Sequence, residues 1–183
     1  MAEEQQEEAD IHRPRELYAY HATSSFATDI SMSYFSYFAV RLGASFELLA
    51  WMQSLNNLLP NTLQHFWGWI SDRRVHRAFW IIIGSVLGGF ALWLLSQAQT
   101  PEEVLALLVL YSASLSLVQP TWAALQGDWI PAGRRGRVLS RFHVVGGMAG
   151  LIGSLVALWF VYNSGSETAD GFRPLFVMAA AAT

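Results

Sequence analysis

The sequence predicts an all-α, polytopic helical membrane protein with five complete transmembrane helices and the start of a sixth. Of its 183 residues, 53% are hydrophobic and only 14% are charged, well below the roughly 25% of soluble domains. Residues 78–97, 104–126 and 142–163 contain no Asp, Glu, Lys or Arg. Each run meets the length of roughly 20 residues that a helix needs to cross a bilayer. A soluble fold is excluded because too little polar surface remains to cover such runs.

Two further spans are less uniform. Residues 48–71 are long enough to cross but carry several amides and Pro60, and residues 21–40 are rich in Ser and Thr and contain Asp29. A sixth span begins at Leu175 and has too few residues to cross.

The predicted organisation is therefore a tail followed by a bundle. Residues 1–17 form an acidic tail that we expect to be disordered, because its like charges cannot bury apolar surface. Residues 18–183 form an incomplete transmembrane bundle. We expect it to be the N-terminal portion of a longer protein; a natural half that works as a dimer is the alternative.

The arginines predict the orientation of the chain in the membrane. Nine of the eleven lie in the tail or in loops 72–77 and 127–141: Arg13, Arg15, Arg73, Arg74, Arg77, Arg134, Arg135, Arg137 and Arg141. The opposite side holds only Arg41 and Arg173. Positive residues concentrate on the cytoplasmic side, so we expect a cytoplasmic N-terminus, in the plasma (inner) membrane.

Polar residues recur along one side of the second span. They follow each other every three or four residues: Gln53, Asn56, Asn57, Asn61 and Gln64. Unpaired amides are costly in lipid, so this side must face protein or a water-filled cavity. The fourth span adds Gln119 beside Pro120, a possible hinge. In the fifth span Gly146, Gly150 and Gly153 share one side and allow another helix to approach closely.

Asp29 is the costliest residue to place in the membrane. An acid at mid-membrane costs roughly 2.5–3.5 kcal/mol and usually marks an ion or proton pathway. Asp29 is therefore a candidate for coupling or substrate binding; the alternative is a carboxyl near the cytoplasmic mouth that stays in water.

Several other functions find little support. The chain has no cysteine, and no histidines or acids show metal-ligand spacing. A net charge of −3 gives no sign of nucleic-acid binding. An intramembrane serine protease would need a facing nucleophile and base, for which Ser45 and His65 are the only pair. A structural or receptor-like membrane protein is the remaining alternative.

Two loop motifs carry a family resemblance. Gly68, Asp72, Arg73 and Arg77 in "GWISDRRVHR", together with "GDWIPAGRRGRVLSR" at 127–141, resemble the signature loop and the acidic-Pro-Arg-Gly segment of the major facilitator superfamily. The chain departs from the family in having no Gly at Val75 or His76. It also lacks the Gly-Pro motif of some proton antiporters, since Leu151 follows Gly150.

The resemblance implies a secondary transporter of twelve helices, with a small-molecule substrate bound between two six-helix halves. A coupling proton or sodium ion, the lipid bilayer and the missing C-terminal half are the implied partners; no cofactor and no enzymatic activity are implied. The cavity residues predicted from the polar sides of the spans and from the cost of Asp29 are Asp29, Asn56, Asn57, Asn61, Gln64 and Gln119. The implied cytoplasmic latch consists of Gly68, Asp72, Arg73, Arg77, Asp128 and Arg137. In it, Asp72 would dock on a helix end of the other half, and Asp128 would pair with Arg73 or Arg77.

Overall fold

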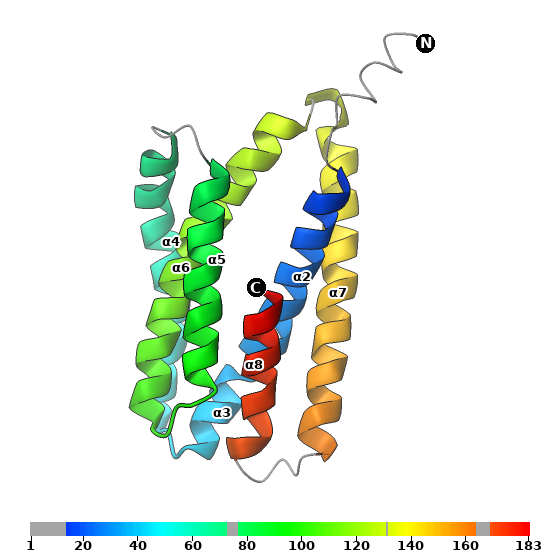
Figure 1. Cartoon of the computed structure of the whole chain (residues 1–183). Helices are drawn as coiled ribbons and strands as arrows, with labels where there is room; N and C mark the ends of the chain where they lie inside the picture. Colours follow the sequence, from blue (N-terminus) through cyan, green and yellow to red (C-terminus); the bar gives the residue numbers. More distant parts are fainter. Residues whose placement is uncertain (1–13, 73–76, 131, 164–168) are drawn as a thin grey trace.

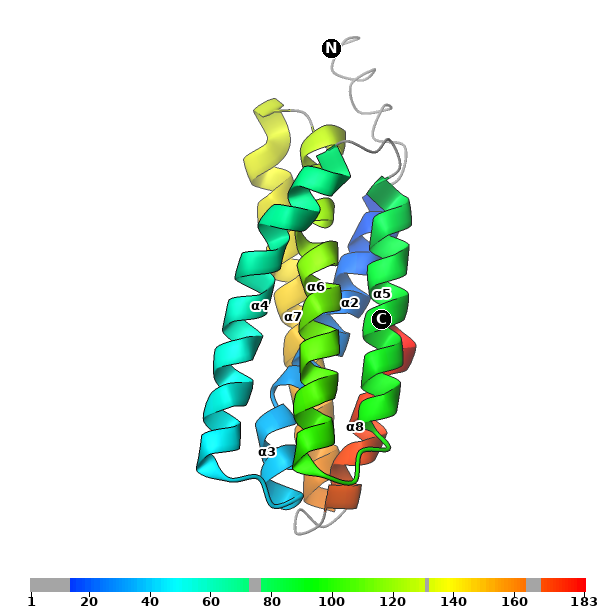
Figure 2. The same cartoon turned by 90° about the vertical axis from the view of Figure 1, so that its left-hand side faces the viewer.

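The computed structural model describes residues 14–72, 77–130, 132–163 and 169–183, and these residues form helices without any strand. The helices are α2 (Pro14–Met32), α3 (Phe35–Arg41), α4 (Phe46–Asp72), α5 (Arg77–Leu95), α6 (Pro101–Trp129), α7 (Arg135–Asn163) and α8 (Arg173–Ala182). Two short 3-10 helices, η1 (Ala132–Arg134) and η2 (Ala169–Phe172), precede α7 and α8. The long helices run alternately up and down and lie side by side (Figures 1 and 2).

Three of these helices are long and apolar enough to cross a membrane: α5, α6 and α7. They contain most of the three charge-free runs, so the prediction of a helical membrane protein is confirmed. Helices α6 and α7 extend beyond their apolar runs into polar sequence. At the start of α6, Thr100 Oγ1 accepts a hydrogen bond from the Glu103 N–H at 3.3 Å. This N-cap begins the helix three residues before the apolar run.

The predicted first span is divided rather than continuous. Helix α2 ends at Met32, a turn follows, and α3 begins at Phe35. The Ser31 hydroxyl donates to the Ala27 carbonyl at 2.7 Å, and such side-chain bonds compete with the backbone bonds of a helix. The count of five spans therefore stays a prediction.

The two ends of the bundle also differ from the expected boundaries. Helix α2 begins at Pro14, so the last four residues of the predicted tail are helical; proline suits the first position of a helix. Residues 1–13 lie outside the described residues. Helix α8 begins at Arg173, two residues earlier than expected.

Glycines bring the main helix pairs together. Gly146, Gly150 and Gly153 of α7 are buried against α2, so the predicted close approach is confirmed. In α5, Gly84 packs closely against Val118 of α6, and Gly88 packs closely against Ser114 of α6. Helix α5 packs against α6 and α8, and 33% of its apolar window is buried.

Candidate functional site

A cavity of about 420 Å³ lies between α2, α6 and α7. Its walls combine hydroxyls, an amide, a carboxylate, two histidines and aromatic rings. They are formed by Tyr20, His21, Ser24, Ser25, Thr28 and Asp29 of α2, Leu115, Val118, Gln119 and Trp122 of α6, and His143, Gly146 and Gly147 of α7. This size and mixture suit a small organic ligand.

Asp29 lies on the α2 wall of this cavity and is half-buried. Its carboxylate packs against Gly150 of α7, where a side chain would leave it no room. Tyr111 of α6 is buried and lies within electrostatic reach of Asp29. In the part of the chain that the structure describes, no Arg ion pair is formed by Asp29.

Aromatic rings form another part of the wall, about 12 Å from Asp29 along α2 at the rise of an α-helix. The Trp122 ring lies 4.9 Å from that of Tyr20 and 6.2 Å from that of His21, measured between centroids. His21 is nearly parallel to Trp122, with 12° between the rings. The His21 ring also meets His143 edge-on at 6.5 Å. Among the described residues no three His, Asp or Glu side chains converge as metal ligands would.

The aromatic wall was missed by sequence reasoning. A signal was present, because His21, Ser25 and Asp29 follow each other at four-residue intervals and therefore share one helix face. That face meets Gly146 and Gly150, which are also four residues apart. Together the two spacings could have paired α2 with α7 and placed His21 in the site.

The predicted amides of α4 are not gathered in this cavity. Asn56 accepts a hydrogen bond from the Ser112 hydroxyl of α6 at 3.1 Å. Asn57 and Asn61 are exposed and donate to carbonyls of their own helix at 2.9 and 2.7 Å. Gln64 is half-buried and lines no described cavity. Of the six predicted cavity residues, the structure brings Asp29 and Gln119 together.

A larger cavity, of about 850 Å³, lies between α2, α5, α6 and α8. Its walls are almost entirely aliphatic or aromatic, and they include none of the predicted site residues. Tyr20 and Trp122 line both cavities. A specific binding site needs a few convergent polar groups, and these groups lie in the smaller cavity.

Among the described residues of the arginine-rich end, one ion pair of the implied latch is formed. Arg77 Nη1 lies 2.8 Å from Asp128 Oδ2, which joins the start of α5 to the end of α6. Arg137 lies in the first turn of α7 and is exposed. Gly68 and Asp72 belong to the backbone of α4, but their surroundings are not among the described features. Arg73 lies in residues 73–76, outside the described residues.

A second arginine contact at this end was not anticipated. Arg135 Nη2 donates to the Gly127 carbonyl at 2.9 Å and to the Ile130 carbonyl at 3.4 Å. These carbonyls lie in the last turn of α6 and just after it, and cations are favoured at helix C-termini. The conformation of the link between α6 and α7 is therefore supported by Arg135.

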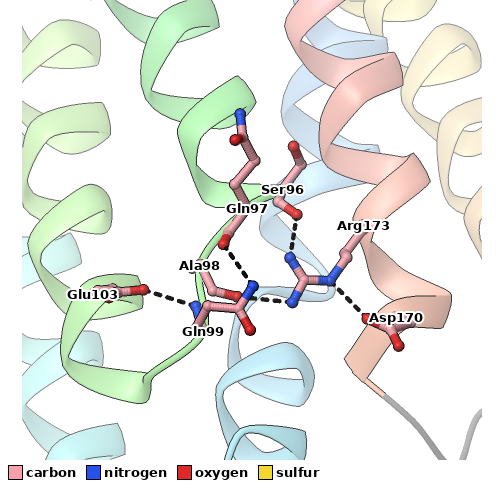
Figure 3. A network of polar contacts seen from close by, with 7 residues as sticks. All are labelled: Ser96, Gln97, Ala98, Gln99, Glu103, Asp170 and Arg173. Atoms are coloured by element: carbon pink, nitrogen blue, oxygen red, sulfur yellow. Dashed lines mark hydrogen bonds and ion pairs between the residues drawn. The ribbon is translucent and has the colours of Figure 1, made fainter.

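At the opposite end, Arg173 ties α8 to the link between α5 and α6 (Figure 3). Its guanidinium donates to the Ser96 carbonyl at 2.6 Å, the Ala98 carbonyl at 3.0 Å and the Asp170 carboxylate at 2.8 Å. The same link is held from α6, where Glu103 accepts from the Gln99 N–H at 2.7 Å. The fork of an arginine suits such multiple acceptors.

The candidate protease pair does not come together. Ser45 precedes α4 and accepts a hydrogen bond from the Leu48 N–H at 3.2 Å, as a helix-capping serine does. His65 lies near the other end of that helix, about 30 Å away at the rise of an α-helix. The pair cannot act as nucleophile and base within one chain.

Apolar helices around a polar, ligand-sized cavity define a helical membrane protein. The family model of the Major Facilitator Superfamily matches residues 17–183, so the chain belongs to this superfamily. Its members are membrane transporters of small molecules. No curated protein matches the chain. No solved structure matches it either.

Proposed function

We propose that this chain supplies one half of a secondary transporter that moves a small molecule by alternating access. The observation that carries the proposal is the cavity between α2, α6 and α7, with the carboxylate of Asp29 on its wall. Secondary transporters of this architecture bind their substrates near the membrane midplane, between two halves. In the proposed function, Asp29 and Gln119 contact the substrate or the coupling ion.

The exposed amides of α4 support a second half that packs on this side. Asn57 and Asn61 each keep polar atoms on the surface of α4, and exposed amides are unfavourable in lipid. Facing another protein half or a wet cleft would remove this cost. We assign Asn56 and Gln64 to the same side of the transport path, with Asn56 held by Ser112.

The arginine-rich end is the proposed cytoplasmic side, in the plasma (inner) membrane. Arg77, Arg135 and Arg137 lie at the end where α4 meets α5 and α6 meets α7 (Figure 1), whereas Arg41 and Arg173 lie at the other. This distribution follows the positive-inside rule. We also assign the cytoplasmic latch to this end, with Asp72 contacting the other half and Arg77 paired with Asp128.

Single cysteines test the proposal, because the chain contains no native cysteine. A cysteine at Ser24 would line the cavity, and cysteines at Gly133 and Thr100 would report the two ends. In sealed vesicles, a membrane-impermeant maleimide should label Gly133→Cys only from the cytoplasmic side and Thr100→Cys only from outside. Alternating access requires that Ser24→Cys react from both sides. Reaction of Ser24→Cys from one side only, or from neither, would overturn the proposed transport cycle.

A further inference from the structure

The cavity between α2, α6 and α7 carries one formal charge. Asp29 is the only Asp, Glu, Lys or Arg among the residues that line it, and two histidines, His21 and His143, line it as well. The membrane-spanning runs of its three walls contain no Arg, and the arginines of α7 lie in its first two turns. The cavity therefore holds one carboxyl group and no Lys or Arg side chain to pair with it.

Aromatic rings line the same cavity as this carboxylate. Trp122 is packed between Tyr20 and His21, with centroids 4.9 and 6.2 Å away. The faces of Trp and Tyr rings attract cations through their quadrupole, Trp most strongly. These contacts also hold the Trp122 ring in a defined position, so it forms a rigid surface for a flat or apolar ligand.

We propose that the substrate of this cavity is an organic cation, that is, a protonated amine or quaternary ammonium on an aromatic or apolar body. This inference rests on the proposed transport function. When the cavity closes to water, an unpaired carboxylate is strongly unfavourable, and a cationic ligand would remove that cost. An anion would be repelled by Asp29, and a neutral ligand would leave it unpaired.

Smaller cations explain the cavity less well. A proton would pair with Asp29 but needs neither the volume of about 420 Å³ nor the aromatic rings of Trp122 and Tyr20. A metal ion would need several converging ligands, and no three such side chains converge in the described part of the chain. The combination of one carboxylate, aromatic rings and a volume of about 420 Å³ fits a cation with an organic body.

Binding of a defined probe tests this inference. The chain would be purified in detergent, and binding of radiolabelled 1-methyl-4-phenylpyridinium would be measured with three unlabelled competitors: the same cation, neutral 4-methylbiphenyl and anionic 4-phenylbenzoate. We expect saturable binding that only the cation displaces. Equal competition by the neutral or anionic compound would overturn the assignment, whatever the behaviour of any variant.

Matched variants then locate the site. Asp29→Asn should weaken binding at least tenfold, whereas Glu102→Gln, which removes an exposed carboxylate outside the cavity, should leave it unchanged. Trp122→Leu should also weaken binding, and Trp122→Phe should retain part of it. Unchanged binding in Asp29→Asn would refute the role of the carboxylate.

The cysteine experiment separates this inference from the proposed function. If Ser24→Cys reacts from both sides but the cation does not bind, transport stands and the substrate class is wrong. If Ser24→Cys does not react from both sides, the transport cycle itself fails, even if the cation binds.

Discussion

At the scale of single residues, the contact between Asp29 and Gly150 decides how α2 and α7 meet. The carboxylate occupies the space that a side chain at position 150 would fill. One turn along each helix, His21 and Ser25 occupy the corresponding space above Gly146. A polar residue on one helix and a glycine on the other thus form a repeated unit, which brings the backbones close while keeping the polar atoms at the cavity.

We predict that Gly150→Ala destabilises the bundle by about 1–3 kcal/mol, the usual cost of overpacking a tight interface. The added methyl would overlap the Asp29 carboxylate, so that side chain or the helix must move. Thermal unfolding in detergent measures the effect. Gly147→Ala is the matched control, because nothing lies within 4 Å of its new methyl. In an Asp29→Ala background Gly150→Ala should cost less, since the clash is absent; equal costs in both backgrounds would show that the contact is not the cause.

At the scale of helices, Arg173 fixes the first turn of α8. Its guanidinium donates hydrogen bonds to two backbone carbonyls of the link between α5 and α6 and to the Asp170 carboxylate (Figure 3). Helix α8 also packs against α5 and α2. Its position depends on this clamp and on the rings of Phe172 and Phe176, which pack on Phe38 of α3 at 6.4 and 5.1 Å.

We predict that Arg173→Met lowers the stability of the bundle by about 1–3 kcal/mol, because the Ser96 and Ala98 carbonyls lose a charged donor. Arg173→Lys should recover only part of the loss, since one ammonium lacks the planar fork that reaches both carbonyls. Thermal unfolding measures both variants, and Arg41→Met, an exposed arginine at the same end of the bundle, is the control. Equal melting temperatures for Arg173→Met and Arg41→Met would show that the hydrogen bonds of Arg173 do not stabilise the bundle.

The helices were largely predictable from sequence, and the reasons are physical. Runs 78–97, 104–126 and 142–163 lack charge for longer than a bilayer requires, so composition alone indicates α5, α6 and α7. Their ends were less predictable because they depend on local caps such as Thr100 with Glu103. The division between α2 and α3 was not predicted, because hydropathy averaged over a run does not detect a short turn.

The site was predictable only in part. Asp29 was evident from its cost in lipid, and Gln119 from its place on a polar side of α6. His21 and Trp122 were not singled out, because their role arises from the contact of α2 with α6 and α7, far away in the sequence. The amides of α4 were predicted to face one cavity, but they point in different directions around the helix. Asn56 faces Ser112 of α6, whereas Asn57 and Asn61 lie on the surface.

At the scale of the whole molecule, the proposed function requires a balance between inward-open and outward-open states. The described ion pair between Arg77 and Asp128 joins α5 to α6 at the proposed cytoplasmic end. Side-chain exposures of 24% and 55% make it a surface pair, and such pairs contribute at most about 1 kcal/mol. A change of that size alters a two-state ratio about fivefold, which is small for folding but substantial for transport.

We therefore predict that Asp128→Asn and Arg77→Gln each shift the labelling of Ser24→Cys toward the cytoplasmic side by up to about fivefold, with near-normal insertion and unfolding temperature. Loss of the pair loosens the inner ends of α5 and α6, so the inward-open state becomes more populated. The charge-swapped double variant, Arg77→Asp with Asp128→Arg, should return the ratio toward that of the parent protein, because an ion pair can form again. Glu102→Gln, at the opposite end of α6, should not change it. If neither single variant changes the ratio, or if the swap fails to restore it, the pair does not belong to a latch and the arginines of this end act only in setting the topology.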